Sequence, residues 1–423
     1  MSYILDQTFN GTGEVLDNTL QNSQINSIQI YGNKIYTAGT YYNSIDYYYY
    51  IARYNLDGTV DTNFGVNGYV LTENTISYNQ FIDVMIIQSD GTIVLLCETL
   101  TGNNFALNFY SSDGTFIKTI DTSYAFYNEY YSSIKKQLNN DNFVITFLNL
   151  NNNFHSFQQY NSDGTKIGDL VQTIFNTAAY IFCWCNTIDS LGNLIFAGRS
   201  SGGPGSVPNP YIYAIYDNTG TYVRTVSYTG TSNGNKGYQA VTTDSENNVI
   251  LIGDYGVNLL LRKYDVNGTL LYSNIESSIT NSNGIQFLIS ISLDGTFIVG
   301  YQTHDTYNSF DFVKFNLDLS LNNNYGVTSI PNQYLYMNKM VIQDDGKILV
   351  GGCEQDDTEA YYNLMFRYAI PTINFTLLFN GNGNNNIKKI RQLLKNDVPK
   401  LAELNNSISL STAQFIDEII FTN

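Results

Sequence analysis

Short apolar segments separated by tight-turn residues recur along most of this chain, and this recurrence constrains the fold more than any other feature. The alternating apolar residues are typical of β-strands, and Asp-Gly or Asn-Gly pairs accept the positive φ that a two-residue hairpin requires. Successive turns of one series lie 47 to 58 residues apart: Gly32-Asn33, Asp90-Gly91, Asn140-Asp141, Gly192-Asn193, Asn247-Asn248, Asp294-Gly295 and Asp345-Gly346. An apolar run such as 93–96 or 348–351 follows each turn.

A second series of turns alternates with the first, and an aromatic-bearing segment precedes most of its members. These turns are Asp57-Gly58, Asp113-Gly114, Asp163-Gly164, Asn218-Thr219-Gly220 and Asn267-Gly268. The series weakens near Asp318 and is lost near Pro371. Two hairpins per unit define four strands, here called a to d in chain order. Seven such units predict an all-β fold, a seven-bladed β-propeller with four-stranded antiparallel blades.

We expect the blades at 25–79, 80–128, 129–179, 180–236, 237–283, 284–333 and 334–380, which gives a propeller domain over 1–380. The seventh unit lacks a recognisable outer strand. Residues 5–13 repeat the pattern of 60–68, which is the outer segment of the first blade. We therefore predict that 3–15 pair as the outer strand of the last blade and close the ring.

The segments 51–70 (IARYNLDGTVDTNFGVNGYV) and 342–352 (IQDDGKILVGG) resemble the delta-60 repeat, a DUF5122-like propeller-forming repeat. The resemblance is strong in blades 1 and 7, weaker in blades 2, 5 and 6, and faint in blades 3 and 4. It implies a β-propeller. It implies no single activity and transfers no catalytic residues. Members of the family occur in large surface, secreted or phage-associated proteins, which favours a scaffold.

The chain carries a net charge of −17, and this acidity disfavours nucleic acid and anionic membranes as partners. The four cysteines are too few for a disulfide framework, which fits synthesis in a reducing cytoplasm. The first residues lack the basic and apolar regions of a signal peptide, and no stretch approaches the length of a membrane span. We expect no membrane insertion and no cofactor or metal.

In a propeller of this kind the a–b and c–d turns share one face, here called the tight-turn face. The longer b–c and d–a connections share the other, here called the loop face. Binding residues commonly lie on such loops above a rigid scaffold. The candidate partner-binding residues are those of the loop face: Tyr41, Tyr42, Ser206, Pro208, His304, Asp356 and Asp357. The adjacent run 47–50 (YYYY) is expected to alternate between the two sides of its blade and pack against its neighbours.

Several patterns suggest chemistry but lack their partners. The motif Gly198-x-Ser200-x-Gly202 would need a strand-to-helix elbow and a histidine. Cys183 and Cys185 could form half of a metal site, but no second pair has the required spacing. A propeller glycosidase would need paired acids around the axis, and the inner strands offer Asp83 without a repeated acid. The sequence predicts no catalytic residues.

From residue 381 the pattern changes to a glycine- and asparagine-rich hinge followed by helical spacing of apolar residues. We expect a hinge and helical tail over 381–423, with a third helical element beginning near Ser411. Five basic residues occur within 388–400. The tail either docks on a partner or sister copy, which we favour, or folds back against its own propeller. The tail residues expected to dock are Ile387, Ile390, Arg391, Leu394, Leu401, Phe415 and Ile419.

Together these features predict a non-enzymatic scaffold for binding or assembly, with other assembly subunits as its protein partners and surface glycan as an alternative ligand. A narrower hypothesis is a virion component of a phage or large virus, such as a tail, fibre, baseplate or capsid-associated protein that recognises a host. Two alternatives stay open. One is a carbohydrate-active propeller enzyme, and the other is a cytoplasmic interaction hub.

Overall fold

A computed structural model describes most of the chain, and each described regular element is a β-strand. The described residues are 4–72, 84–98, 104–137, 140–149, 155–173, 181–200, 211–228, 237–255, 258–280, 287–292, 295–304, 308–322, 328–330, 335–355, 360–369, 374–379 and 416–422. They divide into two compact units, Met1–Ile370 and Pro371–Asn423. Within the described residues, no helix is long and apolar enough to cross a membrane.

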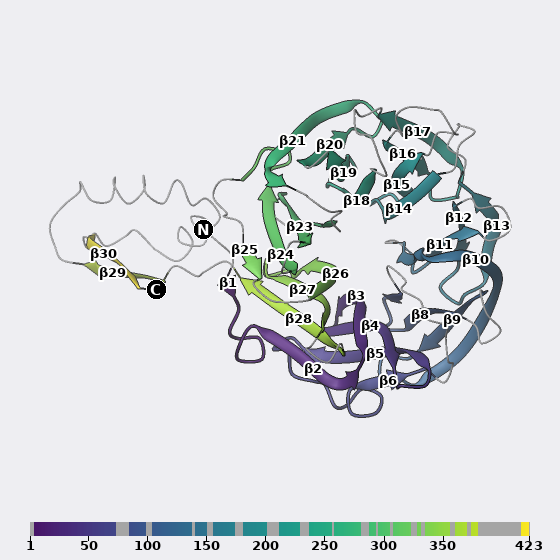
Figure 1. Cartoon of the computed structure of the whole chain (residues 1–423), viewed down its shortest axis with the longest axis horizontal. Helices are drawn as coiled ribbons and strands as arrows, with labels where there is room; N and C mark the ends of the chain where they lie inside the picture. The colour runs from purple at the N-terminus through teal and green to yellow at the C-terminus, as the bar shows by residue number, and fades with distance from the viewer. Residues whose placement is uncertain are drawn as a thin grey trace, which may run out of the picture. The chain divides into compact units, whose positions relative to one another are not determined.

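The first unit is a seven-bladed β-propeller of four-stranded antiparallel blades, as the repeat predicted (Figure 1). Four blades form separate sheets in simple chain order. They comprise β3(Ser23–Tyr31), β4(Lys34–Tyr42), β5(Tyr47–Asn55) and β6(Tyr69–Leu71) in blade 1, β14(Ile181–Ile188), β15(Leu194–Ser200), β16(Tyr211–Tyr216) and β17(Tyr222–Tyr228) in blade 4, β18(Tyr238–Thr243), β19(Val249–Tyr255), β20(Asn258–Tyr264) and β21(Leu270–Thr280) in blade 5, and β22(Phe287–Ile291), β23(Phe297–His304), β24(Asn308–Phe315) and β25(Thr328–Ile330) in blade 6.

Blades 2 and 3 share one long strand and form a single seven-stranded sheet. The strands are β7(Met85–Ile87), β8(Ile93–Glu98), β9(Asn104–Tyr110), β10(Phe116–Lys136), β11(Phe143–Asn149), β12(His155–Tyr160) and β13(Lys166–Gln172). The first half of β10 pairs with β9 and its second half pairs with β11. The expected boundary between these blades, at 128/129, therefore falls inside a continuous strand.

The two ends of the first unit meet in blade 7, whose chain-order strands are β26(Leu335–Ile342), β27(Ile348–Gln355) and β28(Tyr361–Ala369). The outer position is filled by β1(Ile4–Leu5) and β2(Glu14–Gln21), which both pair antiparallel with β28. Ile4 lies opposite Ala369, and Glu14 lies opposite Phe366. Figure 1 shows these purple strands beside the yellow-green β28. The predicted closure by the N-terminal segment is confirmed.

Bulges on several inner strands shape the inside of the ring, and glycines on the second strand accommodate them. The β26 register shifts after Met337, directly opposite Gly352. A Cβ on Gly352 would lie 1.8 Å from the Tyr336 carbonyl oxygen. Blade 1 repeats the arrangement, because β3 shifts after Ile25 opposite Gly39. The missing side chain allows the bulged strand to approach its neighbour closely.

Neighbouring blades pack through aromatic and branched side chains that alternate along each strand. Tyr49 and Ile51 lie in the apolar core that includes blade 2 residues, whereas Tyr50 and Tyr54 lie in the core shared with the N-terminal strands and blade 7. All four side chains are fully buried. This confirms the predicted alternation of the tyrosine run, which follows from the two-residue period of a strand.

The second unit contains β29(Asn374–Phe379) and β30(Ile416–Thr422), which pair antiparallel. The expectation of a helix over 416–422 is wrong. Ile416, Ile419 and Ile420 satisfy helical spacing, but the segment IDEIIFT is equally rich in the β-branched and aromatic residues that favour strands. The helices expected over 387–404 lie outside the described residues. Residues 374–379, expected in the last blade, pair with β30.

Candidate functional site

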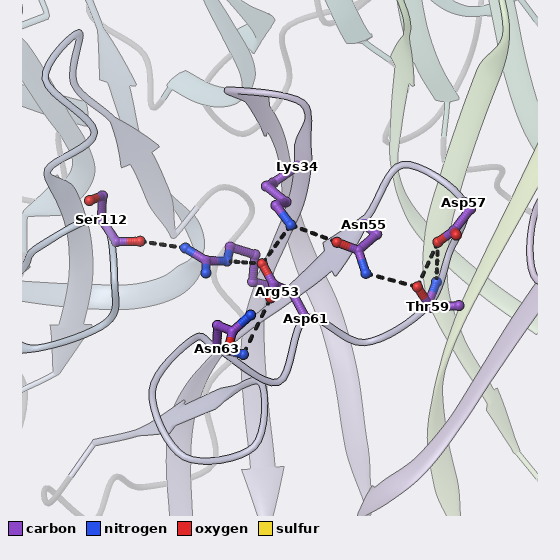
Figure 2. Close-up of polar contacts among 8 residues, drawn as sticks. All are labelled: Lys34, Arg53, Asn55, Asp57, Thr59, Asp61, Asn63 and Ser112. Atoms are coloured by element: carbon purple, nitrogen blue, oxygen red, sulfur yellow. Dashed lines mark hydrogen bonds and ion pairs between the residues drawn. The ribbon is translucent and has the colours of Figure 1, made fainter.

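Aspartates recur on the tight-turn face, and the structure gives most of them a role in the turns. Asp57 accepts hydrogen bonds from the backbone N–H of Thr59 at 3.0 Å and from its hydroxyl at 2.6 Å (Figure 2). The side-chain hydrogen bond from Ser111 lowers the pKa of Asp113 to about 2. Four other turn aspartates each accept the backbone N–H of the residue two positions further along the chain: Asp163, Asp217, Asp265 and Asp318. These carboxylates stabilise hairpins.

A second group of charges on this face joins blade 1 to blade 2. Asp61 lies 2.8 Å from Lys34 Nζ and accepts a hydrogen bond from Arg53 Nε at 2.9 Å (Figure 2). Arg53 Nη1 then donates to the Ser112 carbonyl oxygen in the c–d turn of blade 2 at 2.6 Å. The Arg53 guanidinium also lies over the Phe64 ring, 4.7 Å from its centroid. We call this arrangement the blade latch.

The same latch closes the ring between blades 7 and 1. Arg367 Nε donates to Asp6 at 2.8 Å, and Lys347 Nζ lies 3.3 Å from the same carboxylate. Arg367 Nη1 donates to the Leu56 carbonyl, and its guanidinium lies 4.6 Å from the centroid of the Phe9 ring. The polar groups of the latch are therefore occupied in holding blades together.

Other blades use a shorter version in which a single side chain reaches the equivalent carbonyl of the next blade. Gln159 donates to Asn218 at 2.9 Å, and Lys263 donates to Leu317 at 3.2 Å. In blade 2 the corresponding strand residue is Phe109, and Gln88 from the a–b turn donates to Ser162 at 2.6 Å instead. The turn aspartates and inter-blade side chains named here therefore serve the architecture of the ring.

On the loop face, the β4–β5 hairpin ends in two cross-strand pairs of tyrosines. Tyr42 lies opposite Tyr47 with ring centroids 4.5 Å apart and stacked. Tyr41 lies opposite Tyr48 with centroids 6.0 Å apart. All four side chains are half-buried. Because consecutive strand residues face opposite sides, the two pairs flank the hairpin.

The four residues at the tip of this hairpin form a tightly bonded loop. The Asn43 side-chain oxygen accepts the backbone N–H groups of Ile45 at 2.9 Å and Asp46 at 2.8 Å. The Asn43 N–H donates to the Asp46 carbonyl at 3.1 Å, and Ser44 adopts a φ of 77°. The loop presents Ile45 with 80% of its surface exposed. An apolar side chain is thereby held at the outermost point of an ordered loop.

Asn22, which connects β2 to β3, joins this hairpin to blade 7. Its carbonyl accepts the Tyr42 N–H at 3.0 Å, and its side-chain oxygen accepts the Tyr361 N–H at 3.4 Å. The Tyr361 ring lies 5.9 Å from that of Tyr336. We call the residues gathered here the seam surface: Asn22, Tyr41–Tyr48, Tyr336, Glu354, Gln355, Tyr361 and Tyr362.

The structure places two of the predicted partner-binding residues, Tyr41 and Tyr42, on the seam surface. Ser206, Pro208, Asp356 and Asp357 lie outside the described residues. His304 ends β23 opposite Asn308, and only its backbone is described.

Of the predicted docking residues in the tail, Ile419 lies in β30 opposite Leu377. Ile387, Ile390, Arg391, Leu394, Leu401 and Phe415 fall outside the described ranges, as does Asp83.

Sequence reasoning missed Ile45 and Asn22, and it did not place Tyr47 and Tyr48 at the hairpin tip. Tyr47 packs against the core that includes blade 2, as expected for the run, and the register also brings Tyr47 and Tyr48 opposite Tyr42 and Tyr41. The available signal was the pattern YYNSIDYY, in which an Asn-led loop separates two tyrosine pairs. Asn22 left no such signal, because it acts through contacts with distant segments.

The cysteines of the described chain are placed for packing. Cys183, Cys97 and Cys353 are buried, and burial raises the pKa of Cys353 to about 12. Cys183 pairs in register with Gly198 inside an antiparallel sheet, so Gly198 and Ser200 lie along β15 rather than at a strand-to-helix elbow. Among the described residues, no group of three or more His, Cys, Asp or Glu could hold a metal ion.

Comparisons with known proteins find one matching family model and several similar solved structures. A family model described as a domain of unknown function (DUF5122) β-propeller matches residues 33–64. No curated protein matches the chain. A protein of unknown function from Dyadobacter fermentans is 10% identical with a TM-score of 0.47, covering 85% of this chain and 98% of its own.

Two further solved structures are similar. A Lactobacillus plantarum protein is 11% identical with a TM-score of 0.45, covering 82% of this chain and 96% of its own. The β-propeller domain of the Trilobed protease from Pyrococcus furiosus is 10% identical with a TM-score of 0.47, and the match covers 81% of this chain and 95% of that domain's chain. The chain is a seven-bladed β-propeller whose first blade carries the DUF5122 match.

Proposed function

We propose that this chain is a non-enzymatic recognition scaffold that binds a protein partner through its loop face. The observation that carries the proposal is the ordered tip of the β4–β5 hairpin, where Ile45 stands exposed between two tyrosine pairs. The latch and the turn aspartates of the tight-turn face support it indirectly, since their polar groups are already bonded within the chain.

The chemistry of the hairpin tip suits protein recognition. Tyrosine offers a large, rigid and amphipathic ring at a low cost in conformational entropy, while serine and asparagine adapt their hydrogen bonds. The segment 41–48 consists of four tyrosines, an Asn-Ser pair, Ile45 and Asp46. The bonds within the loop and through Asn22 order this surface before any partner arrives, which lowers the entropic cost of binding.

The test is affinity capture from an extract of the source cells, with protein identification by mass spectrometry. Ile45→Asp places a charge at the exposed tip and should reduce recovery of the specific partner at least tenfold. The matched control is Val66→Asp. Val66 is 78% exposed and also β-branched, and the loop that holds it bonds to the c–d turn of blade 2 on the tight-turn face.

A partner recovered by the wild type and by Val66→Asp but lost by Ile45→Asp supports the proposal. A partner that Ile45→Asp still recovers but Val66→Asp does not would show that binding occurs on the tight-turn face and would contradict the proposal. A glycan-cleaving activity of the purified protein would contradict the non-enzymatic part of the proposal.

We propose two narrower points within this function. The second unit contributes docking contacts to the assembly, so a chain ending at residue 370 should recover fewer assembly subunits. The scaffold is a virion component, which rests on the biased composition and on the family resemblance alone. Its absence from purified particles of a phage or large virus of the source would contradict that reading.

A further inference from the structure

Several aromatic rings in the described part of the chain hold a cation from the chain itself. Arg53 lies over Phe64, Arg367 lies over Phe9, and Arg262 lies over Tyr228 with 3.3 Å between the guanidinium carbon and the ring centroid. Lysines do the same, since Lys166 Nζ lies 4.2 Å from the centroid of the Tyr124 ring. A cation over an aromatic face is stabilised by the negative face of the ring.

Three tyrosines of the hairpin tip, Tyr41, Tyr42 and Tyr48, have the same kind of aromatic face. In the part of the chain that the structure describes, no lysine or arginine lies over the rings of Tyr41, Tyr42 or Tyr48. The Asp46 carboxylate follows Ile45 in the same loop, and no ion pair of Asp46 is described. The hairpin tip thus combines aromatic faces with the carboxylate of Asp46.

We propose that the seam surface binds a segment of a partner protein that carries lysine or arginine next to an apolar residue. This deepens the proposed function and rests on it. The cation lies against the faces of the tip tyrosines within reach of Asp46, and the apolar residue packs on Ile45. The whole-chain charge of −17 steers such a segment toward the protein.

A protein segment fits this surface better than a sugar does. Sugar sites offer an open ring face in a hollow, but Tyr42 and Tyr47 turn one face each toward the other at 4.5 Å. Ile45 projects from the tip with 80% of its surface exposed and offers no hydrogen bond from its side chain. Aliphatic stems of lysine and arginine pack against both kinds of group while their charged ends reach a carboxylate.

The experiment measures binding of fluorescent 15-residue peptides to the full-length protein by anisotropy. Three peptide sets share the same leucine and phenylalanine content and carry charges of +4, 0 and −4. A fourth probe is the chain's own segment 386–401. We expect the +4 set to bind at least tenfold more tightly than the neutral set, and this preference should shrink in 0.5 M NaCl because salt screens the charges.

Matched variants locate the site. Asp46→Asn should weaken binding of the +4 set at least threefold, and Tyr42→Ser or Tyr48→Ser should weaken it at least fivefold. The control is Asp90→Asn, which removes the same charge on the tight-turn face. Asp90 accepts the Thr92 N–H at 2.8 Å, a bond that asparagine keeps. Asp90→Asn should leave binding unchanged, and thermal melts verify that each variant is folded.

Equal weakening by Asp46→Asn and Asp90→Asn would show attraction to the acidic molecule as a whole and overturn the proposal, as would no binding by any set. The neutral set could bind as tightly as the +4 set, and its binding could be lost in Ile45→Ser. This result would support recognition by the hairpin tip but contradict a cationic partner. Tighter binding of the 386–401 peptide than of the +4 set would assign the surface to the tail and overturn the partner reading.

Discussion

At the scale of single residues, similar aspartates divide into two kinds with different consequences. Asp57 closes a turn through bonds that asparagine also accepts, whereas Asp61 balances Lys34 and Arg53 in the blade latch. Both stand next to a hairpin in the sequence, and the difference appears only in three dimensions. Substitution by asparagine separates them, because it keeps the turn bond and removes the charge.

We predict that Asp61→Asn lowers the free energy of unfolding by about 1 to 2 kcal/mol, because two partly buried cations lose their carboxylate. Asp57→Asn should change it by less than about 0.5 kcal/mol. Urea unfolding at pH 7 measures both. A loss for Asp57→Asn as large as that for Asp61→Asn would contradict the assignment of the latch.

The same carboxylate makes a prediction about pH. The hydrogen bond from Lys34 lowers the pKa of Asp61 below 3.8, although burial opposes the shift. A folded-state pKa below the unfolded one adds stability above the unfolded value, and that stability disappears as the pH falls through the folded value. The difference between wild type and Asp61→Asn should therefore shrink between pH 4 and pH 2, as followed by urea unfolding. A difference that stays constant with pH would contradict the ion pair.

At the scale of elements, the glycines opposite the inner-strand bulges are steric requirements. Gly352→Ala should lower the free energy of unfolding by more than about 3 kcal/mol, because its Cβ would meet the Tyr336 carbonyl oxygen at 1.8 Å. The control is Gly346→Ala in the adjacent turn. At Gly346, φ is +79° and no atom lies within 4 Å of the added Cβ. The substitution should therefore lower the free energy of unfolding by only about 1 kcal/mol, because the only penalty is that of the left-handed backbone conformation. Thermal and urea unfolding compare the two.

Some elements could be predicted from the sequence alone, and others could not. Turn pairs such as Asp90-Gly91 and Asp345-Gly346 located the hairpins, because a local pattern determines a tight turn. The continuous β10 could not be found that way, since its two halves belong to different blades. The run 416–422 fits both helical and strand spacing, and pairing with β29 decides between them. Asn22 was invisible for the same reason: its two partners, Tyr42 and Tyr361, lie far away in the sequence.

At the scale of the whole molecule, the first unit should be independent of the second. We predict that a chain ending at residue 370 melts within about 2 °C of the full-length protein, since every blade is complete within Met1–Ile370. Calorimetry of the two chains measures this. A broad or strongly lowered transition of the shorter chain would show that the second unit is required for the ring.

In contrast to removal of the second unit, deletion of residues 1–13 should strongly destabilise the first unit. It removes β1, the Asp6 ion pairs and the buried Phe9, and it should lower the melting temperature by about 5 °C or more or prevent folding. An unchanged melt would show that β2 alone closes the ring. Recognition by the loop face depends on this closure too, because Asn22 holds the hairpin tip from the same N-terminal segment.

The pairing of Ile4 with Ala369 also sets the order of events during synthesis. The two residues are 365 positions apart (369 − 4), so at about 5–20 residues per second the ribosome reaches the second roughly 20 to 70 s after the first. Throughout that time β1 and β2 have no strand to pair with, while blades 1 to 6 emerge one after another with all their own strands. A segment that leaves the ribosome before blades 1 to 6 is therefore among the last to reach its native place, and a chaperone that shields Ile4 and Leu5 until then would raise the yield of closed rings.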